Sequence, residues 1–268
     1  AELQVANVTS LDIASSGQPI SVEVVTKAQW ASATLDAYRP LLDRLAGRLA
    51  QGGPPPEVSE ADAQILDGLL KALNPMMMAM SAGSIAGHLA TKAFGNYVLP
   101  IPRPDDRILI IADNVDAFAE EWSLPAEDVH LWVCISELAT HSVLSVGHVK
   151  AAFERLLNSY VDGFQADPRG FEDRLMDINI SGDDPTELQE QLQGVLSDPE
   201  NLLGALRSEA QNAVVPQLEA LLAVVVGYVD FVVDKVGQGL LGSYTSLLEV
   251  VRRRRFTSSA GDKFVEKL

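Results

Sequence analysis

The sequence is poor in cysteine, which excludes disulfides within the chain, and in basic residues, which argues against nucleic-acid binding. Its one cysteine, Cys134, cannot form a disulfide within the chain, which is typical of a reducing compartment and leads us to expect a cytoplasmic protein. Lys and Arg together number 20 against 37 Asp and Glu, so the formal net charge is −17. Because phosphate binding requires a basic surface, this acidic balance argues against a nucleic-acid partner.

Long apolar runs are also scarce. Residues 220–229 are apolar, but charged residues bound them on both sides and they are too short to cross a bilayer core of about 30 Å. Residues 72–91 carry no formal charge and contain Gly83 and Gly87 at a spacing that can pack membrane helices. Their polar residues favour a buried helix with close helical neighbours instead. The N-terminus shows no signal-peptide pattern, so the sequence predicts no membrane span.

A hydrophobic content of 47% is typical of a globular domain with a substantial core. We predict an N-terminal arm over residues 1–25, in which residues 19–25 form either a short strand or the approach to a helix. We predict a single domain over residues 26–268. Its parts are a helical N-terminal part at 26–94, a small sheet with a site-bearing helix at 95–145, and a helical C-terminal part at 146–268.

The spacing of apolar residues predicts helices around one strand. Residues 30–49 repeat at helical spacing, with Thr26 as the N-cap of their helix. Residues 107–112 are short, β-branched and apolar, and they form the clearest strand. A long helix over 216–236 is followed by a glycine-rich elbow at 237–239. The predicted fold class is α+β, predominantly helical, with one small sheet.

The helix that begins near Pro125 carries a degenerate metalloprotease motif. Residues 136–140 read Ser-Glu-Leu-Ala-Thr, where a zinc protease helix has His-Glu-x-x-His. In that motif the two His lie one turn apart and bind the metal, while the Glu is the general base. Here only the Glu is present, as Glu137. The helix therefore retains one catalytic residue of the motif and lacks both of its ligands.

Four segments together resemble one protein family. They are the helix around Trp30, the stretch at 95–115 that includes Gly-Asn-Tyr-Val-Leu-Pro-Ile-Pro, and residues 131–141 and 224–234. In the order and spacing of these segments, the chain resembles the zincin-like metallopeptidase family of actinobacteria and related bacteria. Members of that family are often described as hydrolases or as associated with deazaflavin-coenzyme biosynthesis. The resemblance implies a zincin-like metalloprotease fold with a helical C-terminal part.

The resemblance also implies where zinc would bind. The family places two ligands in His-Glu-x-x-His and a third, a Glu, on the later long helix. At these positions the present chain has Ser136, Thr140 and Val226. Val cannot coordinate a metal, and neutral hydroxyls are poor ligands beside imidazole or carboxylate. We therefore predict no bound zinc or other cofactor, and we expect the two helices to pack with the three side chains converging.

Three functions remain open on the sequence. The leading hypothesis is a pseudoenzyme of zincin-like fold that binds a protein or peptide ligand or serves as a scaffold, with Glu137 as a vestigial general base. The alternative is an active metal-dependent hydrolase with a rearranged site built from Glu137, His141 and either Asp230 or Asp234. His141 is the weaker catalytic candidate, since it only shares a helix face with Glu137. The third hypothesis is a structural, oligomer-forming protein. We expect no catalytic role for His88, His130, His148 or Cys134.

Overall fold

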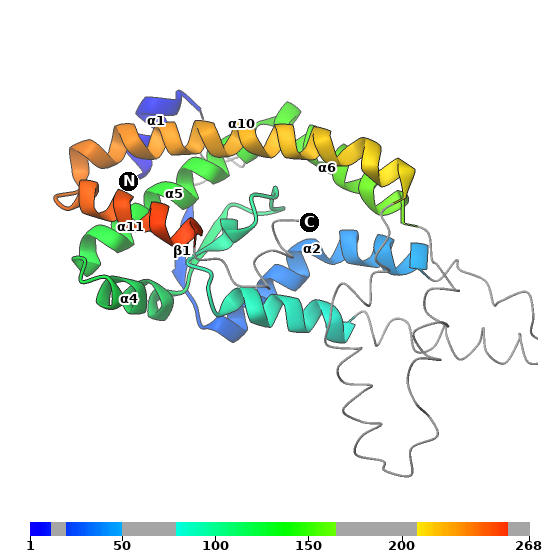
Figure 1. Ribbon diagram of the computed structural model, residues 1–268, viewed down its shortest axis with the longest axis horizontal. Coiled ribbons are helices and arrows are strands. Elements are labelled where there is room, and N and C mark those ends of the chain that lie inside the picture. Colours follow the sequence, from blue (N-terminus) through cyan, green and yellow to red (C-terminus); the bar gives the residue numbers. More distant parts are fainter. Residues whose placement is uncertain (12–19, 50–78, 165–207, 257–268) are drawn as a thin grey trace, which may run out of the picture. The chain divides into compact units, whose positions relative to one another are not determined.

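The computed structural model describes residues 1–11, 20–49, 79–164 and 208–256. These residues are mostly helical and include one two-stranded sheet, which confirms the predicted fold class (Figure 1). The elements are α1 (Glu2–Thr9), β1 (Ser21–Val24), α2 (Lys27–Leu49), the 3₁₀ turn η1 (Asn96–Val98), β2 (Arg107–Ile110), α4 (Ala112–Glu121), α5 (Ala126–Leu144), α6 (Gly147–Asp162), α10 (Glu209–Leu240) and α11 (Tyr244–Phe256). Residues 79–90 are also helical.

The chain divides into two compact units. The first comprises Ala1–Ala37, Gly87–Arg155 and Leu218–Leu268, and the second comprises Tyr38–Ala86 and Leu156–Gln217. In the second unit, Arg44 and Arg48 both form ion pairs with Asp162, and the hydrogen bond from Arg44 is the largest cause that lowers the pKa of Asp162 to about 2. The sheet, α5 and the candidate site belong to the first unit. The domain boundaries given above stay a prediction.

The sheet pairs two strands that are far apart in the sequence. β1 runs parallel to β2, with Ser21 opposite Arg107 and Val24 opposite Ile110. Parallel strands require a long crossover, and here α2 and the helix at 79–90 lie between them in the sequence. Of the two structures predicted for residues 19–25, the strand is therefore the one formed. β2 ends at Ile110, two residues before the predicted end, because α4 starts at Ala112.

A capping box begins α2. The hydroxyl of Thr26 accepts the N–H of Gln29 at 3.2 Å, and the Gln29 side chain accepts the N–H of Thr26 at 2.9 Å. These reciprocal bonds satisfy backbone donors that a helix start would otherwise leave open. The predicted N-cap is thus confirmed. One turn later Trp30 is fully buried, which fixes this end of α2 within the first unit.

α5 is the central helix of the core. Its apolar residues pack with side chains from β2, α1, α4, α10 and α11 in one buried cluster. The cluster includes Val5, Ile108, Val115, Phe118, Val129, Val133, Ile135, Leu138, Val232, Val236 and Leu247. α1 lies in the predicted N-terminal arm and has no clear sequence pattern, because it is only 8 residues long and contributes one buried apolar residue, Val5. A helix this short takes its stability from packing rather than from its own propensity.

One sequence prediction is wrong. The elbow at 237–239 is helical, since α10 continues to Leu240. Gly237 instead allows close packing, because a Cβ there would lie 2.5 Å from Cε2 of Tyr244. Among the described residues nothing lies within 4 Å of a Cβ placed at Gly83 or Gly87. Residues 72–78 of that stretch lie outside the described residues, so the close helical neighbours expected there stay a prediction. Among the described residues, no single helix is long and apolar enough to span a membrane. α5 and α6, which are bent by 83° relative to each other, reach that length and apolar composition only when they are taken together.

Candidate functional site

The candidate site lies on α5 and on the segment that precedes β2. α5 begins after Pro125 and has Glu127 and Asp128 in its first turn, where the helix dipole favours negative charge. Ser136, Glu137, Thr140 and His141 occupy its C-terminal half. Glu137 and His141 are separated by four residues and are both buried, so this face of α5 is covered.

Glu137 is bound by backbone rather than open to solvent. Its carboxyl group accepts the N–H of Tyr97 at 3.1 and 3.3 Å, and the N–H of Asn96 also hydrogen-bonds to it. The residue is 7% exposed. Burial raises the pKa of Glu137 to about 8, although the two N–H groups and the charge of Arg103 oppose the rise. Glu137 therefore fastens η1 to α5.

Gly95 is in direct contact with this carboxyl group. A Cβ at Gly95 would lie 2.4 Å from Cδ of Glu137. The backbone of Gly95 is extended, with φ −150° and ψ −160°, so the close approach and not the conformation requires glycine. The side chain of Glu137 thus fills the space directly above the backbone of the segment.

His141 makes contacts through both ring nitrogens. Nδ1 lies 2.7 Å from the hydroxyl of Tyr97, and Nε2 lies 3.2 Å from Oδ1 of Asp106. A carboxylate only accepts hydrogen bonds, so Nε2 donates to Asp106 and Nδ1 accepts from Tyr97. The imidazole is 1% exposed, and this burial lowers its pKa while Asp106 acts in the opposite direction. The neutral ring joins both residues to α5.

The start of the covering segment is held from its other side as well. The carbonyl of Gly95 accepts Nε1–H of Trp30 at 3.0 Å. The side chain of Asn96 donates to the carbonyl of Arg107 at 2.6 Å and accepts the N–H of Leu109 at 3.2 Å. These bonds fix residues 95 and 96 to α2 and β2.

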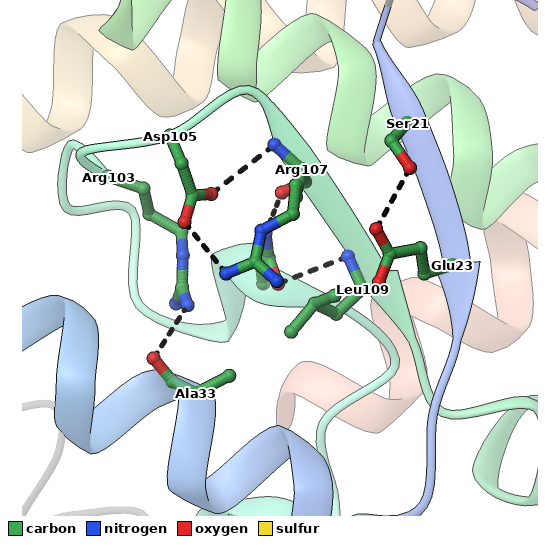
Figure 2. A network of polar contacts seen from close by, with 8 residues as sticks. Ser21, Glu23, Ala33, Arg103, Asp105, Arg107 and Leu109 are labelled. Carbon is green, nitrogen blue, oxygen red and sulfur yellow. Dashed lines mark hydrogen bonds and ion pairs between the residues drawn. The ribbon is translucent and has the colours of Figure 1, made fainter.

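The residues just before β2 form a polar turn (Figure 2). The guanidinium of Arg103 donates to the carbonyl of Ala33 on α2 at 3.3 Å, and Arg103 is 7% exposed. Asp105 accepts hydrogen bonds from the backbone and side chain of Arg107, and the latter bond raises the pKa of the Arg107 guanidinium. This turn positions Asp106 toward His141.

The three positions that the resemblance assigns to zinc do not fit the metal. The hydroxyl of Thr140 donates to the carbonyl of Ser136 at 2.8 Å, which engages it within its own helix. Ser136 is half-buried, and Val226 on α10 is 38% exposed and offers only an alkyl group. Zinc sites in proteins use thiolate, imidazole or carboxylate ligands, and none of these residues supplies one. The expected convergence of the three side chains stays a prediction.

The alternative residue set is not assembled as a metal site in this structure. No three His, Cys, Asp or Glu residues in the described ranges are grouped so that they could hold a metal ion. The carboxyl group of Asp234 accepts hydrogen bonds from Tyr244 at 3.1 Å and from Gln238 at 2.8 Å, while Asp230 is exposed. Glu137 and His141 do lie together, and both contact Tyr97: Glu137 accepts its backbone N–H, and His141 contacts its hydroxyl.

The other singled-out residues have different surroundings. His130 contacts Asp116 at 2.7 Å near the start of α5, and His88 and His148 are exposed. Cys134 is half-buried, and burial raises the pKa of its thiol, with the charge of Glu137 adding to the effect. A raised pKa disfavours the thiolate that a nucleophile requires.

Sequence reasoning missed Tyr97 and Asp106. Both lie within the segments that carried the family resemblance, but neither belongs to a recognised catalytic spacing. The available signal was local, because the proline-rich segment before β2 also contains Asn, Tyr and a pair of Asp residues. Such polar residues beside a buried strand are often held by side-chain hydrogen bonds.

Comparison with known proteins places these features in a family. A solved structure described as a "putative hydrolase with a novel fold", from Chloroflexus aurantiacus, matches with a TM-score of 0.50 and 16% identity. The match covers 94% of this chain and 62% of that one, and at this identity it shows a shared fold only. No curated protein matches the chain. The family model for zincin-like metallopeptidases matches residues 1–268, and the chain therefore belongs to the zincin-like metallopeptidase family.

Proposed function

We propose that this protein keeps the zincin-like fold without zinc-dependent peptide hydrolysis, and that it acts as a binding or scaffold protein for a protein or peptide partner. The observation that carries the proposal is the set of side chains at the ligand positions, Ser136, Thr140 and Val226. A catalytic zinc site has three protein ligands and an open position for water. None of these side chains is a suitable donor.

The surroundings of Glu137 support the same proposal. A general base must reach the proton that it removes, directly or through one water. Glu137 is instead buried against the backbone of residues 95–97, and its carboxyl group already accepts two N–H groups. Without a metal to lower the pKa of a water, a lone carboxyl group has no activated nucleophile to use. We extend the proposal to a cytoplasmic location, with which the single cysteine is compatible.

Zinc titration of the purified chain tests the proposal. We expect less than stoichiometric zinc by elemental analysis after purification without chelators, and no calorimetric binding at micromolar zinc. The Glu137→Gln variant should then leave any residual peptidase activity unchanged. One zinc per chain that is lost in His141→Leu, Asp230→Asn or Asp234→Asn would contradict the proposal and favour the rearranged metal site.

A restored ligand set sharpens the test. The triple variant Ser136→His, Thr140→His and Val226→Glu has the donors that the family uses, and it should gain measurable zinc affinity if α5 and α10 keep the zincin arrangement. Its control is the double variant Ser136→His and Thr140→His, which lacks the third ligand and should bind more weakly. Equal affinity in both variants would show that position 226 was assigned incorrectly.

A further inference from the structure

One imidazole contacts both ends of a loop. Tyr97 precedes residues 98–105 and Asp106 follows them, and both side chains end on His141 at 2.7 and 3.2 Å. We propose that His141 holds this loop, residues 98–105 and called here the proline loop, in its closed position. The two hydrogen bonds that join His141 to Tyr97 and Asp106 are called the clasp, and their loss releases residues 98–105 as one unit. The proposal concerns a conformational device of the fold and is independent of whether the protein binds zinc.

The composition of the proline loop makes it depend on its ends. Pro100, Pro102 and Pro104 have no N–H group, so they cannot donate backbone hydrogen bonds to neighbouring elements. The N–H of Ile101 bonds to the carbonyl of Leu99 at 2.8 Å, a contact that stays inside the loop. Arg103 attaches the middle of the loop to Ala33 at 3.3 Å. The clasp therefore supplies side-chain contacts that few backbone donors here can replace.

The segments that flank the proline loop are anchored separately. Gly95 and Asn96 are bonded to Trp30 and to β2, and the residues that follow the loop belong to β2 itself. None of these bonds involves His141. Loss of the imidazole should therefore affect the loop and leave both anchors in place.

Burial gives the released loop a reason to open. In the closed state, removal of the imidazole would take one hydrogen-bond partner from the Tyr97 hydroxyl and one from the Asp106 carboxylate, which costs free energy. Tyr97 is half-buried and the Asp106 side chain is 15% exposed, so a small outward movement would hydrate both. Opening of the loop relieves this cost, whereas opening of the core would not.

Hydrogen exchange with mass spectrometry tests the clasp. In His141→Leu, which fills a similar space without hydrogen bonds, the amides of the non-proline residues among 98–106 should exchange at least about tenfold faster, as expected for the loss of one or more net hydrogen bonds. The amides of Asn96 and Leu109 should keep their protection. The matched control is His130→Leu, because His130 lies on the same helix and also contacts an Asp, yet does not touch the loop.

Each remaining outcome is decisive. Unchanged exchange in the loop, or faster exchange spread evenly over the first unit, would overturn the proposal and make His141 an ordinary core residue. If His141→Leu does not fold, Tyr97→Phe and Asp106→Asn each remove one arm of the clasp, and each should accelerate exchange in residues 98–106. Failure of both to do so would equally overturn it.

Discussion

Two carboxyl groups on α5 show how burial overrides hydrogen bonding. Asp128 accepts the N–H and the hydroxyl of Ser243 at 2.7 and 2.6 Å, and Glu137 accepts the N–H groups of Tyr97 and Asn96. The backbone of Gly242 also hydrogen-bonds to Asp128, so Asp128 has three donors and Glu137 has two. The pKa of Asp128 is lowered, chiefly by the Ser243 hydroxyl, whereas burial raises the pKa of Glu137 to about 8.

The difference comes from where each group lies. Asp128 is half-buried in the first turn of α5, where water and the helix dipole both favour its charge. Glu137 is buried in the middle of the helix, where the charged form loses its hydration and two N–H groups do not replace it. Hydrogen-bond donors alone would have predicted a lowered pKa for both acids. The following changes should break this contrast or measure it.

The largest effect is expected from Glu137→Gln at alkaline pH. The folded-state pKa of Glu137 is raised from 4.5 to about 8, so its contribution to stability is fully present below pH 4.5 and is lost as pH rises through about 8. The neutral variant should escape that loss and exceed the wild type by on the order of a few kcal/mol at pH 9. Urea unfolding at pH 5, 7 and 9 measures this. The free energy of unfolding of the control, the exposed Glu120→Gln, should follow that of the wild type at all three pH values. If the free energy of unfolding of Glu137→Gln also changed with pH in parallel with the wild type, the raised pKa of Glu137 would be contradicted.

A somewhat smaller effect is expected from Gly95→Ala. The added methyl would meet Cδ of Glu137 at 2.4 Å, so the segment or the side chain must move, and we expect a loss of about 1–3 kcal/mol in the free energy of unfolding. In a Glu137→Ala background, adding Gly95→Ala should lower the free energy of unfolding only slightly further, because the side chain that the new methyl would meet is gone. Gly87→Ala is the control, since it lies in a helix with open space around it and should be neutral or stabilising. If the losses in the free energy of unfolding from the two substitutions were additive in the double variant, the close contact between Gly95 and Glu137 would be contradicted.

The smallest effect concerns the other carboxyl group. Asp128→Ala removes the acceptor for two donors of Ser243 and should lower the free energy of unfolding by about 1–2 kcal/mol at pH 7. Because the folded-state pKa of Asp128 is lowered, its contribution is present above pH 3.8 and is lost as pH falls through the folded value. The gap between variant and wild type should therefore close in acid, opposite to Glu137. A gap that is constant with pH would mean that packing, and not charge, is what the substitution removes.

The sequence predicted best those features that depend only on residues close together in the chain. The capping box at Thr26, the apolar run of β2 and the start of α5 after Pro125 were predictable, since each depends on neighbours in the chain. The replacement of zinc ligands at residues 136, 140 and 226 was inferred by position in the family pattern and stays a prediction. The pairing of Tyr97 and Asp106 on His141 was not, because it depends on residues 35 and 44 positions away from the helix residue they contact.

The elbow at 237–239 failed for a related reason. Glycine was interpreted by its backbone freedom, but Gly237 is helical and is required by the ring of Tyr244. A glycine that makes room for a neighbour cannot be told from a glycine that bends the chain until the neighbour is known. α1 was missed because a single buried valine gives no periodicity to read.

The side chain of Asn96 has a consequence for association between molecules. Its carboxamide donates to one backbone group of β2 and accepts from another, as a peptide group of an adjacent strand would. β1 occupies one edge of β2, and Asn96 occupies these positions on the other. An open strand edge is a template for pairing with a second chain and hence for aggregation. One asparagine thus closes the edge of β2 against strand addition without the cost of building a third strand.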